Sequence, residues 1–259
     1  MERCILNVKR RKDVRSAIVF SDCHVPFFDP NCEGIILETI SQQKPDMVII
    51  NGDFIDCHDI SRFVNVEPVD LAYEFDEGRK FLRRLRKQYD GPIHYTEGNH
   101  EYRLTKYIAS QARELRGIRG LTIHEQLDLK PLDITYHQNR GCGSCLFGPI
   151  HIRHGERIRK YSAYSARWEF EDIVQASLVM GHTHRQGVFC TNIKTNYWAV
   201  EAGCTCLLEA DYAPNPNWQQ GFAIIKLVDR HAQCDLISIN NGKAIIANES
   251  YTYIPPKKK

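Results

Sequence analysis

The sequence predicts an α/β fold, with a parallel sheet in its first half and mainly β structure in its second half. Short apolar runs alternate with amphipathic stretches of helical periodicity up to about residue 115. Short strand-like runs separated by turns follow from residue 132 onward. With 259 residues, 42% of them hydrophobic, the chain can bury one sizeable core, so we expect a single domain over residues 1–259 that ends in a short basic tail at 255–259.

The first half contains strands and helices in strict alternation. Strands are expected at 16–22 (SAIVFSD), 46–53 (DMVIINGD) and 91–99 (GPIHYTEGN). Helices are expected at 32–43, 74–89 and 102–115. A strand–helix–strand order implies parallel strands joined by helical crossovers.

The second half is expected to contain strands and little helix. The expected strands are 132–137, 145–155, 177–184, 187–191, 196–203, 222–228 and 234–239. Loops joining them are too short to separate a second domain, and no internal repeat is present.

Charge and hydropathy give few indications of a partner. Lys and Arg total 34 against 32 Asp and Glu, so the net charge of +2 does not by itself indicate a nucleic acid or an anionic membrane. No signal-like apolar segment and no uninterrupted run of about 18 apolar residues occurs. We therefore expect a soluble, intracellular (cytoplasmic) protein without a membrane partner.

The ten cysteines are interpreted as reduced thiols, because the chain is neither small nor preceded by a secretory signal. Two pairs have alternative interpretations, Cys142/Cys145 and Cys204/Cys206. Together they could form a structural zinc site, although about 60 residues separate them. Alternatively, the G-C-G-S segment at 141–144 forms a hairpin turn between two strands.

Residue types that bind metals follow five of the expected strands. They occur in the order D-C-H, G-D-F-I-D, G-N-H-E, H-G and G-H-T-H, at the strand ends where open α/β sheets place their sites. In the last block, His182 and His184 are two residues apart, so in an extended strand both imidazoles point the same way. One such pair also occurs in ordinary surface loops, whereas five blocks in this order are not a chance arrangement.

These five blocks resemble the signature of the calcineurin-like metallophosphoesterases, and they span Asp22 to His184. The resemblance implies a four-layer α/β/β/α fold, in which helices flank a β-sandwich. It also implies that two divalent metal ions at the strand ends hydrolyse a phosphoester with a hydroxide that bridges them.

The resemblance further assigns the ligands of the two ions. One ion would be held by Asp22, His24, Asp53 and His184, and the other by Asp53, Asn99, His154 and His182. Asp53 would bridge ions about 3.5 to 4 Å apart. Ligands of this kind, without a thiolate, suit Mn²⁺, which we expect, and also Fe, Zn²⁺ or Mg²⁺. Cys23 and Cys57, beside ligands, are expected to be core thiols.

Two further residues have a catalytic role in the resemblance. His100 would donate a proton or hydrogen bond to the leaving-group oxygen, and Asp56 would orient His100. The alternative for Asp56 is a helix N-cap, which does not exclude the first role.

The substrate is less clearly indicated. Protein phosphatases of this superfamily carry arginines where this chain has Cys57 and Glu97, which argues against a phosphoprotein substrate. Other arginines could bind the phosphate in place of the two that are missing: Arg103, Arg157, Arg159 and Arg185.

Residues 79–119 include eleven Lys or Arg and only four acidic residues. These cations could form a solvated helix face, or they could form a basic rim that binds a polyanion. Tyr161, Tyr164 and Trp168 could stack on bases or belong to the core. We therefore expect a phosphodiesterase or nuclease acting on DNA, RNA or nucleotides. The alternatives are a phosphomonoesterase on small molecules or phosphoproteins and a non-catalytic scaffold.

Overall fold

The computed structural model describes residues 13–61, 69–192, 195–209, 216–247 and 249–254. The predicted basic tail at 255–259 lies outside these residues. The first half of the chain contains β1 (Arg15–Phe20), α1 (Pro30–Gln43), β2 (Met47–Asn51), α2 (Leu71–Gln88), β3 (Ile93–Thr96), α3 (Glu101–Gln111), α4 (Ile123–Gln126) and β4 (Ile134–His137).

The second half contains two short helical segments, α5 (Tyr164–Glu169) and the π-helical turn η2 (Phe170–Val174). Its strands are β5 (Ser144–Phe147), β6 (Ile150–Arg153), β7 (Leu178–Met180), β8 (Gln186–Cys190), β9 (Trp198–Ala202), β10 (Gly221–Val228), β11 (His231–Ser238), β12 (Lys243–Ile246) and β13 (Glu249–Thr252). The expected β character of this half is confirmed.

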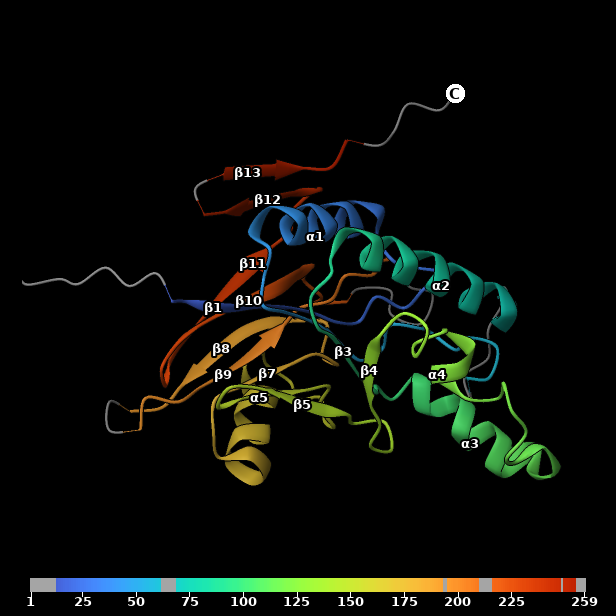
Figure 1. Cartoon of the computed structure of the whole chain (residues 1–259). Helices are drawn as coiled ribbons and strands as arrows, with labels where there is room; N and C mark the ends of the chain where they lie inside the picture. The colour runs from blue at the N-terminus through green and yellow to red at the C-terminus, as the bar shows by residue number, and fades with distance from the viewer. Residues whose placement is uncertain (1–12, 62–68, 193–194, 210–215, 248, 255–259) are drawn as a thin grey trace, which may run out of the picture.

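Two sheets face each other, and helices cover their outer faces (Figure 1). The larger sheet has the order β11-β10-β1-β2-β3-β4, and the smaller has the order β5-β6-β7-β9-β8. Strands β1, β2 and β3 pair in parallel, as predicted. Strand β4, expected among the short strands of the second half, also pairs in parallel with β3, whereas β10 pairs with β1 in antiparallel fashion. The predicted four-layer α/β/β/α arrangement is therefore confirmed.

The period-2 alternation of the strands divides the core between the layers. In β1, Ala17 and Val19 pack between the sheets, while Ile18 and Phe20 pack beneath α1 and α2. On the far side, Ala166 of α5 packs against Leu178 of β7.

The main helices begin at residues that favour helix initiation. Asp29 caps α1 by accepting a hydrogen bond from the Asn31 N–H, and Pro30 occupies the first helical position. Asp70 caps α2 through the Ala72 N–H. Since α2 is capped by Asp70 and residues 57–61 are not helical, Asp56 is not a helix N-cap and that alternative is wrong.

Three local expectations need correction. The G-C-G-S segment is not a hairpin turn, because it joins β4 of one sheet to β5 of the other. The expected strand at 145–155 is a hairpin of β5 and β6 that turns at 148–149. The expected helix at 102–115 ends at Gln111, and a 3₁₀ turn follows it at Arg113–Leu115. Strands β12 and β13, which lie beside α1, were not expected.

Candidate metal centre

The metal-binding residue types meet where parallel strands of both sheets end. The loops after β1 and β2 are joined by backbone hydrogen bonds from Asp22 N to Gly52 O (3.1 Å) and from His24 N to Asp53 O (3.0 Å). The loops after β6 and β7 supply His154 and His182. Parallel neighbours end at the same sheet edge, so side chains that are far apart in sequence come together here.

Left-handed backbone conformations recur among the predicted ligands. Five of the seven predicted ligands have a left-handed φ, between 48° and 67°: Asp22, His24, Asp53, His182 and His184. Such conformations cost about 1 kcal/mol or more for residues with a Cβ and are concentrated at functional sites. Strand β7 ends at Met180, so His182 and His184 do not lie in an extended strand, and the expectation that both point the same way is wrong. His184 lies with Asp22 and His24, whereas His182 lies with Asp53 and His154.

Two glycines permit the close approach of these loops. A Cβ on Gly98 would clash with the carboxylate and backbone nitrogen of Asp53. A Cβ on Gly181 would come within 2.6 Å of Asp22 Oδ2. The glycines that begin the G-N-H-E and G-H-T-H blocks are therefore required for space.

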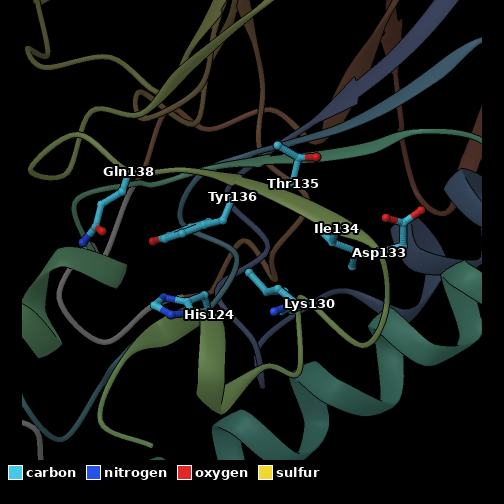
Figure 2. Close-up of a pocket in the computed structure, with 8 residues that line it drawn as sticks. His124, Lys130, Asp133, Ile134, Thr135, Tyr136 and Gln138 are labelled. Atoms are coloured by element: carbon cyan, nitrogen blue, oxygen red, sulfur yellow. The ribbon is translucent and has the colours of Figure 1, made fainter. Parts of the chain in front are cut away.

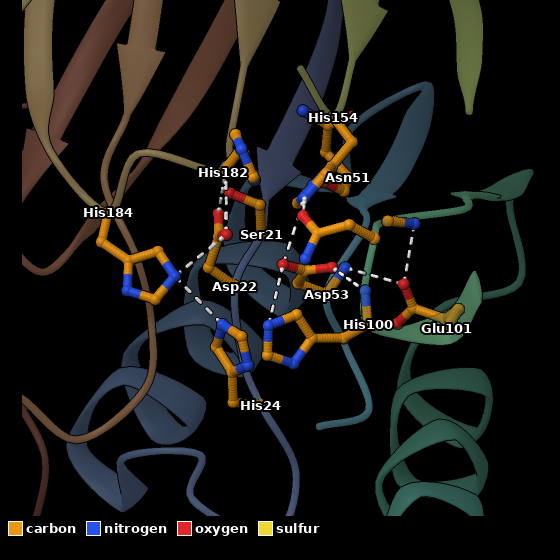
Figure 3. Close-up of polar contacts among 12 residues, drawn as sticks. Ser21, Asp22, His24, Asn51, Asp53, His100, Glu101, His154, His182 and His184 are labelled. Atoms are coloured by element: carbon orange, nitrogen blue, oxygen red, sulfur yellow. Dashed lines mark hydrogen bonds and ion pairs between the residues drawn. The ribbon is translucent and has the colours of Figure 1, made fainter. Parts of the chain in front are cut away.

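One side of the site is formed by Asp22, His24 and His184 (Figure 3). The two imidazole Nε2 atoms are 3.0 Å apart, and His184 Nε2 lies 3.3 Å from Asp22 Oδ1. The second nitrogen of His24, Nδ1, bonds to Asp56 Oδ1 at 2.8 Å. This contact leaves Nε2 directed at its neighbours, as in an oriented metal ligand.

The other side is formed by Asp53, His154 and His182, together with Asn99, which contacts His154. His154 Nε2 lies 3.2 Å from Asp53 Oδ2 and 3.1 Å from Asn99 Oδ1. Its Nδ1 bonds to the carbonyl oxygen of Asn51 at 3.0 Å, which again leaves Nε2 for the site.

Asp53 is common to both sides. Its carboxylate oxygen lies within 4.8 Å of donor atoms of Asp22 and His24, and also of donor atoms of His154 and His182. Burial opposes its ionisation, but the positive charges of His100 and His154 lower the pKa of Asp53 well below its usual value. A buried, ionised carboxylate thus stands between two groups of imidazoles.

His100 and Asp56 lie beside this centre and contact each other. His100 Nδ1 is 2.8 Å from Asp56 Oδ1, while His100 Nε2 is 2.9 Å from the Arg103 guanidinium. Asp56 contacts His24 as well, so one carboxylate orients both a predicted ligand and the predicted proton donor. Burial lowers the pKa of His100, which in this arrangement accepts a hydrogen bond from Arg103.

Glu101 is a supporting residue that we did not predict, although it belongs to the quoted G-N-H-E block. Its buried carboxylate accepts hydrogen bonds from the backbone N–H groups of Asp53, Phe54, Ile55 and Gly98, and from the Tyr95 hydroxyl. It therefore holds the Asp53 loop against the Asn99 loop.

Cys206 is a second unpredicted neighbour of the site. Its sulfur lies within 4.8 Å of ring nitrogens of His24 and His184. A hydrogen bond from the Cys204 thiol lowers the pKa of Cys206 well below its usual value. Cys206 is therefore a further candidate donor, which the expected ligand set did not include.

The nine described cysteines are all free, and Cys23 and Cys57 are buried, as expected for core thiols. The two cysteine pairs form no shared cluster within the described residues, because Cys206 faces the histidines above and Cys145 faces a different pair. A zinc site built from both pairs is therefore not formed.

The four candidate arginines occupy different environments. Arg103 donates to His100 Nε2 and to the Asp56 carbonyl oxygen. Arg157 and Arg159 lie over the Trp168 ring, at 4.6 and 5.5 Å from its centroid. Arg185 is buried and donates to the carbonyl oxygens of Arg159 and Lys160, so its guanidinium holds this loop in place.

The basic run over 79–119 separates into two parts. On α2, the cations are used locally: Arg79 pairs with Asp76, Lys80 with Glu77, Arg83 with Asp128 and Arg84 with Glu33. On α3, Arg103 and Lys106 line a cavity of about 670 Å³ together with Tyr107, Asn99 and His182. Only this second part borders the metal-binding residues.

A separate cavity of about 400 Å³ lies between α4 and β4 (Figure 2). It is lined by side chains such as His124, Lys130 and Tyr136, and it contains none of the predicted site residues. This cavity is therefore separate from the metal-binding residues, which border the α3 cavity.

The sequence model of the calcineurin-like phosphoesterase family matches residues 16–186. The chain belongs to this family. It is therefore a metal-dependent phosphoesterase, a hydrolase of a family that typically uses two metal ions.

Similar proteins cover most of this phosphoesterase. The Gene 54 proteins of Mycobacterium phages L5 and D29 are 29% and 27% identical to it, over 87% of this chain and 94% of theirs. Vacuolar Protein Sorting 29 from Cryptosporidium parvum shares its fold with a TM-score of 0.50 and 12% identity, covering 93% of this chain and 99% of that one. Among the described residues, no helix is both long and apolar enough to cross a membrane.

Proposed function

We propose that this phosphoesterase is a phosphodiesterase that acts on nucleic acid or nucleotides at the site between His184 and Asn99. The observation that carries the proposal is the α3 cavity, which extends from the metal-binding residues Asn99 and His182 past Arg103 to Gln111. At 1.5 Å per helical residue, the α3 wall beyond Arg103 is about 12 Å long. A single phosphate group would leave most of this length unused.

The residues present fit two divalent cations. Asp22, His24, Asp53 and His184 would hold one, and Asp53, Asn99, His154 and His182 would hold the other, with Asp53 common to both. When bound, such ions acidify a water molecule between them and withdraw negative charge from the phosphoryl oxygens. Mn²⁺ suits the carboxylate, amide and imidazole donors of both sets, whereas the Cys206 thiol favours Zn²⁺ or iron beside His184.

The chain's own side chains would orient and protonate the substrate. Asp56 holds the His100 ring through Nδ1, which leaves Nε2 facing Arg103. When a phosphate displaces the guanidinium from that nitrogen, Arg103 can bind a phosphoryl oxygen and a protonated His100 can donate from Nε2 to the departing oxygen. Arg103 is thus the first candidate for the missing phosphate clamp.

The wall of the cavity supports a nucleotide better than a small monoester. Tyr107 is exposed, and Lys106 is exposed beside it, with its ammonium 4.8 Å from the Tyr102 ring centroid. An aromatic face next to a cation is the usual arrangement for stacking a base while neutralising its phosphate. Exposed Tyr161 and Tyr164, with ring centroids 5.5 Å apart, offer a second stacking surface beside Lys160, whose ammonium lies 5.3 Å from the Tyr161 ring centroid.

The proposal is tested with bis-p-nitrophenyl phosphate, p-nitrophenyl phosphate and single-stranded oligonucleotides as substrates. Lys106→Glu and Tyr107→Ala should lower kcat/KM on oligonucleotides about tenfold or more and leave bis-p-nitrophenyl phosphate hydrolysis within twofold. Lys80→Glu, which changes a cation paired on α2, is the control.

Two outcomes would replace the proposal. Preference for the monoester, with no oligonucleotide cleavage, would establish the phosphomonoesterase alternative. Absence of turnover on all substrates, in protein shown to contain metal, would establish a non-catalytic scaffold.

A further inference from the structure

A second group of metal-binding side chains lies outside the catalytic centre. It consists of His94 on β3, His137 at the end of β4 and Cys145 on β5. One donor atom of each lies within 4.8 Å of the other two. None of the three belongs to the five blocks that form the catalytic site.

The two imidazoles face each other closely. His94 Nδ1 is 2.8 Å from His137 Nε2, and the rings are stacked at 12° with centroids 5.0 Å apart. Burial lowers the pKa of both histidines, so both are neutral near pH 7 and each keeps a lone pair for a ligand. A hydrogen bond between two neutral rings would explain the contact between the histidines. It would not explain why a buried thiol lies beside them.

The thiol completes a borderline-soft donor set. Cys145 is buried and is not part of a disulfide, and although its backbone belongs to the β5–β6 pair, its thiol makes no hydrogen bond within the described part of the chain. Two nitrogens bound to a tetrahedral zinc ion lie about 3.3 Å apart, so the rings need to separate by about half an ångström. Both histidines are only half-buried, which leaves a fourth position open to water.

We propose that His94, His137 and Cys145 form a structural site for Zn²⁺ or a divalent ion of similar softness. Binding exchanges the thiol proton for the metal: a sulfur–metal bond forms and one proton passes to solvent. Neutral imidazole and thiolate are the ligands that zinc prefers, and three protein ligands with one water satisfy its tetrahedral coordination.

The position of the site gives the ion a structural purpose. Strands β4 and β5 are edge strands of the two sheets, and the segment 138–143 joins them across the open side of the sandwich. An ion bound by β3, β4 and β5 would therefore connect the two sheets at this edge. The same joining segment donates from Asn139 N and Gly141 N to Glu97, two residues before Asn99.

The test uses the full chain, loaded with Zn²⁺ and then freed of unbound metal. A zinc-edge anomalous difference map should show a peak between the three side chains, apart from those at the catalytic centre. In solution, Cys145→Ser and His137→Gln should each contain about one zinc ion fewer per chain than the wild type. Cys142→Ser is the matched control, because Cys142 accepts a hydrogen bond from Arg153 and belongs to no such cluster.

The variants should also lose part of the rise in Tm that zinc produces, while phosphoester hydrolysis stays within about twofold. If Cys145→Ser does not fold, His94→Gln, at a half-buried position, gives the same measurement. Equal zinc content in wild type and folded variants would overturn the proposal. A map with peaks at the catalytic centre and none between these three residues would do so as well.

Discussion

At the scale of single residues, the predicted ligands are oriented by contacts through their other polar atoms. His154 is held through Nδ1 by the Asn51 carbonyl oxygen, and His24 is held through Nδ1 by Asp56. Asp22 accepts hydrogen bonds from the His182 N–H at 3.0 and 3.1 Å. Such contacts fix the direction of the remaining lone pair, on which metal affinity depends.

Loss of a ligand should remove metal and turnover together. Asp53→Asn or His154→Ala is expected to lower bound metal and to abolish hydrolysis, because the remaining ligands cannot hold the metal ions in their coordination geometry. Elemental analysis and initial rates on the same preparations measure both effects. Full metal content with normal rates in either variant would contradict the assignment.

His100 should behave differently from the ligands. His100→Ala is expected to keep its metal and to lower kcat by roughly 10²- to 10⁴-fold, with a larger loss on an alkyl ester than on a p-nitrophenyl ester. An alkoxide needs the proton, whereas p-nitrophenolate is stable as an anion. Metal loss would make His100 a ligand, and equal losses on both esters would exclude proton donation.

Asp56→Asn tests the two contacts of the Asp56 carboxylate, one with His100 and one with His24. It should reproduce the leaving-group dependence of the His100 variant more weakly, since it disturbs orientation and not the donor. Because Asp56 also bonds to His24, some loss of metal affinity should accompany it. Metal titrations of the two variants side by side distinguish these effects.

At the scale of elements, strand ends and short turns position the site, and one buried side chain connects them. Glu101, in the first turn of α3, accepts four backbone hydrogen bonds from the loops after β2 and β3. Burial, followed by the charge of Asp53, raises the pKa of Glu101. These backbone N–H groups have no partners within the loops, and the Glu101 carboxylate accepts their hydrogen bonds instead.

Glu101→Gln should therefore weaken the site without removing a ligand. An amide can accept fewer of these hydrogen bonds and introduces donors without partners, so we expect a loss of about 2 kcal/mol or more in unfolding free energy. Metal affinity should fall as well. Chemical denaturation and metal titration measure the effects, with the half-buried Glu77→Gln as a control expected to stay within about 0.5 kcal/mol. Equal stability of the two variants would refute the positioning role.

At the scale of the whole molecule, the sandwich brings carboxylates of the first half against imidazoles of the second. Burial would lower the pKa of His154, but the charge of Asp53 raises it to about 9 in the metal-free protein. This raised pKa means that protonated His154 contributes stability below its ordinary value of 6.5, and that the contribution is lost as the pH rises through about 9.

Metal must displace that proton, so the stabilisation by metal should increase with pH. We expect the rise in Tm on adding Mn²⁺ or Zn²⁺ to grow between pH 6.5 and about 9 while metal-free protein becomes less stable. Thermal unfolding with and without metal across this range measures it. His231→Gln, an exposed position, should keep the trend, and a rise in Tm independent of pH would refute the coupling.

The sequence by itself determined the features that depend on local pattern. The alternation of apolar runs with amphipathic helices was enough to predict the parallel strands β1 to β3, and the blocks at strand ends were enough to predict the family. That β4 extends the parallel sheet was not predicted. Periodicity is a property of each segment, because burial of one face repeats every 2 or 3.6 residues. The structure brings all seven predicted ligands, His100 and Asp56 into one region.

Only the tertiary structure decided what depends on contacts between distant segments. It placed Cys206 beside His24, gathered His94, His137 and Cys145 at the open edge of the sandwich, and buried Arg185 beneath a loop. It also distinguished the paired cations of α2 from Arg103 and Lys106 in the cavity. Spacing along the chain carries no information on these contacts, because they depend on how two sheets pack face to face and on which loops their edges bring together.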